Sequence, residues 1–466
     1  MEVKQNKMGI VPVPKLLLSM GVPMMLSMVG QALYNMVDTF FVSRIPDTAQ
    51  VADMGDKAIN ALTLAYPVQT LIIALIVGVG IATNSLLAQS LGRRDRERAS
   101  RIAGNAMLIC AGFFLLIFLF GLFGAQAFIQ SQTQDPVVAE MGTAYLRIVT
   151  IFSLGTIGYM CLEKVVMGCG NTKATMIGQL TGALTNIILD PIFIFGYLGL
   201  PAMGVRGAAW ATVIGQFFSF FVIAYVNFFR NREIDKGWRY FRPSRDILKQ
   251  FSTISIPAIF QQIMTPVLTY GMNLVLGTLS AAAVTAYGVY YKLQYFVTMS
   301  VFGLNNASIP IVAYNYGAGN RQRISQSIKH ALLDVWVIMA VSVAILQIFT
   351  GPIVGIFDLG EEPRRLCMTA VHIITCGYFF VGTNIILQGV CQALGNGVYS
   401  LIISMLRYAV IVLPLAYLFT LTSQADVLVW TALPIAEGVA CVVSVILTRK
   451  LYRKRGKEIE QRSAEA

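Results

Sequence analysis

The sequence has few charged residues for its length. Asp, Glu, Lys and Arg make up 12% of the 466 residues, which is about half the share usual in soluble domains. So few charges cannot cover the surfaces of the two or three domains into which a soluble chain of this length would fold. We therefore exclude a soluble enzyme, and because 56% of the residues are hydrophobic, we also exclude a disordered chain.

Residues that build metal and nucleophile sites are also scarce. His330 and His372 are the two histidines, and the seven cysteines form no CxxC pair. A disulfide framework or a zinc site is therefore not expected. The sequence contains no GxxxxGK[ST], HExxH or GxSxG motif. We expect no enzyme, no cofactor and no direct use of ATP.

Long apolar runs dominate the chain, and its mean hydropathy is +0.67. A helix that spans a bilayer needs about 20 mainly apolar residues. The N-terminal run is too long for a signal peptide and has no small-residue cleavage site, so we count it as a span. The sequence predicts an all-α integral membrane protein with twelve transmembrane helices. Their predicted limits are 14–42, 57–88, 98–127, 137–167, 173–196, 206–229, 249–277, 281–312, 325–356, 365–393, 398–420 and 427–449.

The distribution of basic residues predicts the orientation. Of the 35 Lys and Arg residues, 26 lie at the two termini or in loops that follow even-numbered spans. Lys and Arg favour cytoplasmic loops, so we expect a multi-pass protein of the cell inner (plasma) membrane with both termini in the cytoplasm. This bias accounts for the net charge of +12, and we expect no nucleic-acid partner.

The chain contains an internal repeat. The segment AQSLGRRDRERAS at Ala88 matches AYNYGAGNRQRIS at Ala313, and other identities share the same offset of 225 residues. Pro23 and Pro257 match at an offset of 234. Six spans separate the copies, which predicts parallel, pseudo-symmetric six-helix lobes, an architecture typical of transporters. A duplicated bundle without transport is the alternative. We expect lobes at 1–229 and 250–450, a basic cytoplasmic linker at 230–249 and a cytoplasmic tail at 451–466.

Several motifs resemble the multidrug and toxic compound extrusion (MATE) family over essentially the whole chain. They are YNMVDTFFVSR in the first span, NIILDPIFIFG in the fifth, GAAWAT in the sixth and the paired GN turns at 170–171 and 395–396. The resemblance implies a secondary active antiporter. Such a protein exports bulky, mostly cationic organic compounds in exchange for H⁺ or Na⁺ by alternating access. We expect it to work as a monomer in the lipid bilayer.

Five acidic residues fall within predicted spans, where a charge costs at least ~2.5 kcal/mol and function is the default reading. Asp38, Glu163 and Asp190 belong to the first lobe. The repeat places Gln388 opposite Glu163 and an uncharged residue opposite Asp38. The two lobes are thus chemically unequal. The other two acids, Asp334 and Glu437, are interpreted as structural, with Arg407 or Lys292 as the partner of Glu437.

Helical spacing groups the polar residues of the first lobe. Gln31, Tyr34 and Asp38 share one helix face, and Asn186 lies one turn before Asp190, which precedes a helix-kinking Pro191. The resemblance assigns cation coupling to Tyr34, Asp38, Glu163, Asn186, Asp190 and Thr212, with a Na⁺ site at Asp38, Asn186, Asp190 and Thr212. For the substrate cavity we expect Met28, Gln31, Tyr145, Tyr291 and Gln388, because flexible methionine and aromatic faces suit varied cations.

The expected mechanism depends on Asp38 and Asp190. Two carboxylates close together in a low dielectric cannot both stay ionised without a cation between them. Uptake of H⁺, which we prefer, or of Na⁺ would displace a cationic drug. In the bland alternative these acids, with Asn186 and Thr212, only join helices by hydrogen bonds. Glu163 and Lys164 are neighbours in sequence, so their side chains diverge by ~100° and we expect Glu163 to pair elsewhere.

Other function classes remain open alternatives. A lipid-linked oligosaccharide flippase of the wider superfamily would need a basic cavity for pyrophosphate, whereas the first lobe buries acids. A channel or receptor would show uncoupled downhill flux. A membrane enzyme has little catalytic material in this sequence.

Overall fold

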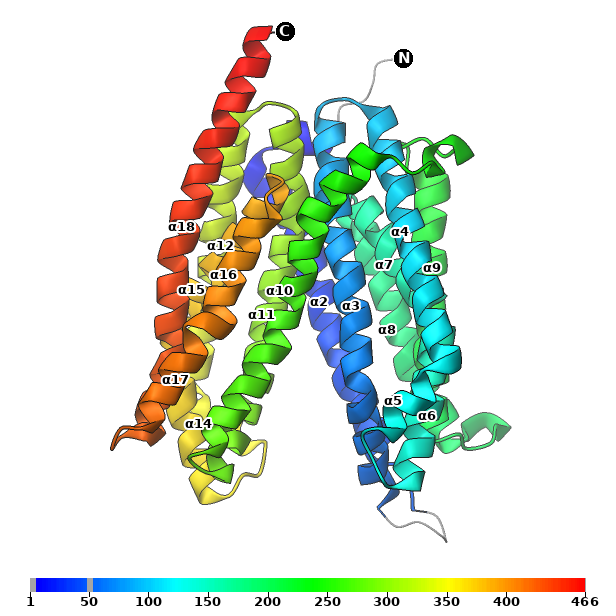
Figure 1. The fold of residues 1–466 in the computed structure, drawn as a ribbon, viewed down its shortest axis with the longest axis vertical. Helices are drawn as coiled ribbons and strands as arrows, with labels where there is room; N and C mark the ends of the chain where they lie inside the picture. Colours follow the sequence, from blue (N-terminus) through cyan, green and yellow to red (C-terminus); the bar gives the residue numbers. More distant parts are fainter. Residues whose placement is uncertain (1–5, 48–52, 466) are drawn as a thin grey trace. The chain divides into compact units, whose positions relative to one another are not determined.

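The computed structural model describes residues 6–47 and 53–465, with side chains as far as residue 461. Within those ranges the regular elements are helices, and no strand occurs (Figure 1). Lys4 of the basic N-terminal flank and Ala466 of the predicted tail lie outside the described residues, as do residues 48–52.

Eleven described helices are long and apolar enough to cross a membrane, and a bent pair of shorter helices makes a twelfth span. The prediction of an all-α membrane protein with twelve spans is confirmed. The spans are α2 (Val13–Ser43), α3 (Met54–Gly92), α4 (Arg96–Phe123), the pair α6 (Pro136–Ile151) and α7 (Leu154–Gly168), α8 (Thr172–Phe195), α9 with η2 (Val205–Tyr225, Val226–Arg230), α10 (Arg245–Gly277), α11 (Ala281–Gly317), α12 (Arg321–Ile348), α14 to α15 (Glu361–Ile374, Tyr378–Ala393), α16 to α17 (Gly397–Met405, Val412–Thr420) and α18 (Ala425–Glu465).

Short elements connect or interrupt these spans. The helices α6 and α7 are bent by 46° at their break, which the hydropathy pattern did not predict. The π-helix η5 separates α16 from α17, and π-turns inside helices are frequent at functional sites. The remaining short elements are α1 (Lys7–Ile10), α5 (Ala125–Gln130), η1 (Tyr197–Gly199), η3 (Trp238–Phe241), α13 (Thr350–Gly355), η4 (Thr375–Gly377) and η5 (Leu406–Val410).

The helix α18 continues well past the predicted limit at residue 449 (Figure 1). Hydropathy ends there because the sequence becomes rich in Lys, Arg and Glu, but these residues are good helix formers. Contacts with the rest of the chain hold the extension. The hydroxyl of Tyr316 donates to Glu458 at 3.0 Å, and the side chain of Ile459 is buried.

The internal repeat is a repeat of structure. An offset of 225 residues carries the limits of α4 onto those of α12, and those of α5 onto those of α13. It also carries α8 onto the span from Gly397 to Thr420. The GN turns match as well, since Gly170 and Gly395 both have positive φ and Asn171 and Asn396 both cap the helix that follows. The two halves therefore share one fold.

The chain divides into two compact units. The N-terminal unit consists of Leu26–Leu87 and Arg96–Lys249, and the C-terminal unit of Met1–Met25, Ala88–Asp95 and Gln250–Ala466. The predicted lobes assign Met1–Met25 and Ala88–Asp95 to the first lobe and treat 230–249 as a separate linker. The lobe boundaries themselves stay a prediction.

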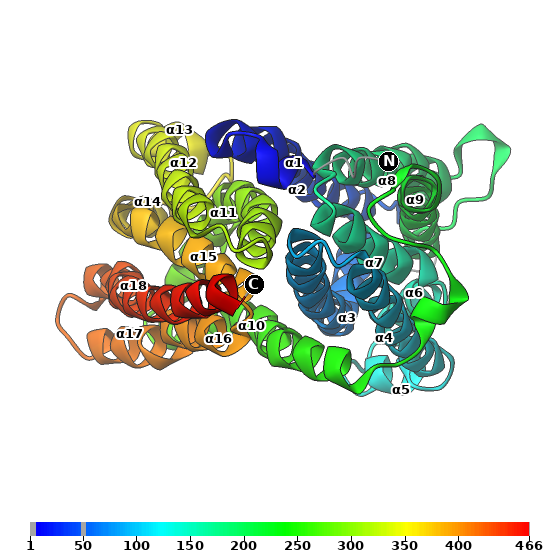
Figure 2. The same ribbon diagram turned by 90° about the horizontal axis from the view of Figure 1, so that it is seen from above.

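Small residues pack α8 against α9 in the N-terminal unit, where the two helices run side by side (Figure 2). A Cβ atom on Gly182 would lie 2.0 Å from Ser219 Oγ and 2.8 Å from the carbonyl oxygen of Gly215. The Ser219 hydroxyl donates to the carbonyl of Gly178 at 2.9 Å. Glycine at these positions lets the two backbones approach closely, and this approach brings Asn186 of α8 to Thr212 of α9.

Candidate cation-coupling site

Two carboxyl groups meet inside the N-terminal unit. Asp38 on α2 and Asp190 on α8 are within hydrogen-bonding contact of each other. Asp190 is fully buried, and Asp38 is half-buried. The helix α8 runs through Pro191 as one uninterrupted helix from Thr172 to Phe195, so the predicted effect of this proline is limited to a missing backbone N–H one residue after Asp190.

An amide and a hydroxyl extend this pair. The Asn186 side-chain Nδ2 donates to Asp190 Oδ1 and to Thr212 Oγ1, at 3.3 Å in each case. The predicted Na⁺ ligands Asp38, Asn186, Asp190 and Thr212 are therefore brought together by the packing of three helices. Each comes from a different turn, so their proximity depends on the tertiary fold.

Three oxygen atoms of this group have no hydrogen-bond donor among the described residues. They are Asp38 Oδ1, Asn186 Oδ1 and Asp190 Oδ2. A buried acceptor without a partner costs ~1–3 kcal/mol, and more if it is charged. Ionised carboxylates only accept hydrogen bonds, so two that touch require a proton or a cation. This arrangement can hold a single hard cation or a shared proton.

Tyrosines adjoin the carboxyl pair. Tyr145 on α6 is buried, and its hydroxyl accepts a hydrogen bond from Gln69 Nε2 at 3.0 Å. Asp38 and Tyr34 are electrostatic neighbours of this hydroxyl. The sequence analysis missed Gln69 as a member of the network, although it noted that the repeat pairs Gln69 with Gln294.

Glu163 pairs with the residue that we expected it to avoid. Lys164 Nζ lies 3.3 Å from Glu163 Oε2, and both side chains are less than a tenth exposed. The lysine stem packs over Gly80, where a Cβ atom would lie 2.6 Å from Lys164 Cγ. Both chains are long enough to bend together, which overrides the ~100° divergence of neighbours on a helix. The expectation of a different partner was wrong.

The predicted substrate residues fall in both units. Met28 and Gln31 are half-buried on α2, and with Tyr145 they belong to the N-terminal unit. Tyr291 and Gln388 belong to the C-terminal unit. Tyr291 is half-buried, whereas Gln388 is 2% exposed and hydrogen-bonds Ser404 Oγ at 2.8 Å. A common substrate cavity stays a prediction.

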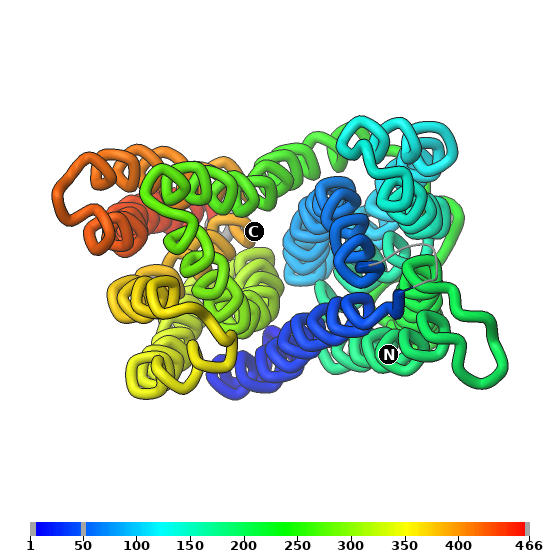
Figure 3. Tube along the Cα trace, turned by 90° about the horizontal axis from the view of Figure 1, so that it is seen from below, coloured from blue at the N-terminus to red at the C-terminus, as the bar shows by residue number. Residues whose placement is uncertain are grey.

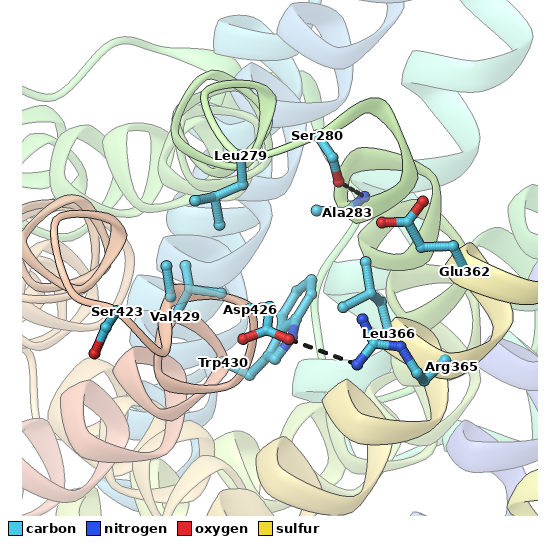
Figure 4. A pocket seen from close by; sticks show the side chains of 11 residues that line it. Leu279, Ser280, Ala283, Glu362, Arg365, Leu366, Ser423, Asp426, Val429 and Trp430 are labelled. Atoms are coloured by element: carbon cyan, nitrogen blue, oxygen red, sulfur yellow. Dashed lines mark hydrogen bonds and ion pairs between the residues drawn. The ribbon is translucent and has the colours of Figure 1, made fainter.

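A cavity of about 290 Å³ lies at one end of the C-terminal unit (Figure 4). It is formed where the α10–α11 turn, the first turn of α14 and the α17–α18 turn meet, as seen from below in Figure 3. Arg365 and Asp426 form an ion pair at 3.5 Å beside the buried Trp430. None of the predicted site residues lines this cavity. Within the described residues, no group of three or more His, Cys, Asp or Glu is placed to hold a metal ion.

Comparison with known proteins agrees with this architecture. The model of the MatE family matches residues 23–192 and 257–418, so the two matches begin at the prolines that the repeat pairs. The multidrug export protein MepA of Staphylococcus aureus is 24% identical over 456 residues, which are 95% of each chain. A protein of Shewanella oneidensis named FAD transporter is 24% identical and covers 92% of this chain and 94% of its own.

Solved structures show the same fold. A multidrug resistance MATE family transporter of the MOP superfamily, in an outward-facing conformation, superposes with a TM-score of 0.90. It is 24% identical and covers 98% of this chain and 100% of its own. The family match spans more than two thirds of the sequence and both copies of the repeat. The chain therefore belongs to the MatE family of multi-pass membrane transporters.

Proposed function

We propose that this protein is a secondary active multidrug efflux antiporter. It exports bulky, mostly cationic organic compounds in exchange for H⁺ or Na⁺. The observation that carries the proposal is the contact between Asp38 and Asp190, in which two buried carboxyl groups leave oxygens without donors. The names of the relatives, multidrug export protein among them, support the substrate class.

Asp38 and Asp190 act as the exchange site in this proposal. Without a bound proton or Na⁺ the pair carries negative charge, which attracts an organic cation. When the coupling ion binds, the charge is neutralised and the attraction is lost, so the organic cation leaves. Asn186 and Thr212 orient the pair through the 3.3 Å contacts of the amide. Alternating access then moves the site between the two sides of the membrane.

The donor set is compatible with either coupling ion. Carboxylate, amide and hydroxyl oxygens are ligands for a hard cation such as Na⁺. Two carboxyl groups in contact can equally share a proton, and we prefer the proton because the pair needs no further ligand to hold it. A plasma-membrane location with cytoplasmic termini and function as a monomer complete the proposal.

The test is efflux of ethidium from vesicles that contain the purified protein. A pH gradient and a Na⁺ gradient are imposed separately, on the wild type and on Asp38→Asn and Asp190→Asn. We expect one of the two gradients to drive efflux, and both variants to lose it. Asp334→Asn is the matched control, because it removes an acid from the membrane-spanning helix α12 of the other unit and should leave efflux unchanged.

Two results would overturn this proposal. Full gradient-driven efflux in both aspartate variants would exclude the coupling site. An absence of ethidium movement under either gradient would instead favour an anionic substrate, as for an oligosaccharide flippase. Because one relative is named FAD transporter, FAD is an informative anionic probe in the same vesicles.

A further inference from the structure

A buried ion pair lies in the C-terminal unit, apart from the site described above. Arg407 on η5 donates through Nε to both carboxylate oxygens of Glu437 on α18, at 2.8 and 3.0 Å. The two side chains are 2% and 10% exposed. Charges buried to this degree persist only when they are paired and hydrogen-bonded.

Two amides on α15 complete the cluster. Asn384 Nδ2 donates to Glu437 Oε2 at 2.8 Å. Gln388 Oε1 accepts from Arg407 Nη1 at 3.3 Å and from Gln261 Nε2 at 3.2 Å. Carboxylate and amide oxygens thus surround a single guanidinium, so the group has the composition of a cation site whose cation belongs to the protein.

The repeat relates this cluster to the site of the N-terminal unit. At the offset of 225 residues, Glu437 corresponds to Thr212 and Gln388 to Glu163. Arg407 corresponds to Gly182, the residue at which α8 and α9 approach most closely. The long arginine side chain therefore starts from the place that a glycine leaves empty in the other half, and it starts within a π-helix.

The two halves differ in how their oxygens are satisfied. In the N-terminal unit Asp38, Asn186 and Asp190 each have an oxygen without a donor. In the C-terminal unit both oxygens of Glu437 and the oxygen of Gln388 accept from Arg407. Asp38 and Asp190 need a mobile ion or a proton, whereas Glu437 has a tethered one.

We infer that the C-terminal unit holds the counterpart of the exchange site, with the guanidinium of Arg407 in permanent possession of the cation position. This inference goes beyond the proposed function and rests on it only for the word exchange. Removal of the guanidinium should open a site for a small monovalent cation, with Glu437 as its charged ligand.

The surroundings of Arg407 fit a free guanidinium ion as well as the tethered one. The guanidinium carbon lies 4.7 Å from the ring centre of Tyr408, a distance that gives a favourable cation–π contact. A cavity of about 20 Å³, lined by Arg407, Tyr408 and Glu437 among others, adds room for about one water molecule. Truncation of the arginine would enlarge this space by the volume of its own side chain.

The experiment compares full-length Arg407→Ala with the wild type and with the double variant Arg407→Ala/Glu437→Gln, each purified and placed in lipid nanodiscs. Radiolabelled guanidinium at low millimolar concentration is the probe, and equilibrium binding and the thermal unfolding midpoint are measured. We expect Arg407→Ala to bind one more guanidinium per chain than the wild type and to be stabilised by it. The double variant should show neither effect.

Each other outcome overturns the inference. One is a folded Arg407→Ala that binds no more guanidinium than the wild type. Another is a single variant that cannot be recovered even with guanidinium in the buffer while the double variant can, because Glu437 then accepts no free cation. A third is failure of both variants to fold, which would make the pair a packing element. Since no transport is measured, these outcomes are independent of the efflux test on Asp38 and Asp190.

Discussion

Thr212 and Glu437 occupy equivalent positions in the two halves of the chain, and each contacts a side-chain amide from a neighbouring helix. Thr212 Oγ1 accepts from Asn186 Nδ2 at 3.3 Å, and Glu437 Oε2 accepts from Asn384 Nδ2 at 2.8 Å. The same place in the fold is polar in both halves, but only the second half fills it with a charge and supplies a countercharge. This difference concentrates the unpaired acids in the N-terminal unit.

Close packing of α8 on α9 should be necessary for the exchange site. Gly182→Ala forces a Cβ atom against Ser219 and the Gly215 carbonyl, so we expect the free energy of unfolding to fall by about 1–3 kcal/mol and efflux to fall with it. Gly112→Ala is the control, since a Cβ atom there meets nothing within 4 Å. Equal behaviour of the two variants in thermal unfolding would contradict the packing argument.

The pair Glu163 and Lys164 should behave as one neutral group. Lys164→Met leaves a buried, uncompensated carboxylate, which should cost about 3–5 kcal/mol of stability. The double variant Glu163→Gln/Lys164→Met should recover most of that loss, because no charge is left unpaired. Chemical unfolding of the three proteins in one detergent measures the difference. Additive losses in the double variant would show that the two side chains act independently.

Tyr145 and Gln69 should act through their shared hydrogen bond. Tyr145→Phe leaves the Gln69 amide without this acceptor and should cost about 1 kcal/mol. Gln69→Leu should cost a similar amount, and the double variant little more than either, as expected for residues in contact. A double-mutant cycle of ethidium efflux and thermal unfolding tests the coupling, and a coupling energy of zero would dispose of it.

Acid should weaken the connection between α3 and α6. Lys57 Nζ lies 2.6 Å from Asp135 Oδ2, and this hydrogen bond, with a second from the Val137 N–H, lowers the pKa of Asp135. A carboxyl whose pKa is lower in the folded state stabilises the protein above its ordinary pKa of about 3.9, and this stability is lost as the pH falls through the folded value. The unfolding midpoint of the wild type should therefore fall more steeply below about pH 4 than that of Asp135→Asn. Parallel curves for the two proteins would contradict the role of this contact.

Sequence patterns were sufficient for the number of spans, for the repeat and for the proximity of Asn186 to Asp190, because each depends on hydropathy, identity or spacing within one helix. The bend between α6 and α7 was not predictable in this way, since no proline marks it. The extent of α18 was underestimated because hydropathy measures membrane burial and not helix formation.

Partners of buried charges were harder to predict than their burial. Arg407 was one of two predicted partners for Glu437, and the fold selects it because η5 and α18 are in contact. Lys164 was rejected on helix geometry, which ignores the reach of a long side chain. Gln69 carried no signal apart from its place in the repeat, because its role depends on where α3 meets α6.

The most direct test of the exchange site measures ion release when an organic cation binds. Ethidium is added to purified wild-type protein in weakly buffered detergent solution, and released protons are followed with a pH indicator and released Na⁺ with a radioactive tracer. The account predicts that binding of ethidium releases one of these ions from the wild type and neither from the Asp38→Asn/Asp190→Asn variant. Saturable binding of ethidium to the wild type with no release of either ion would contradict it.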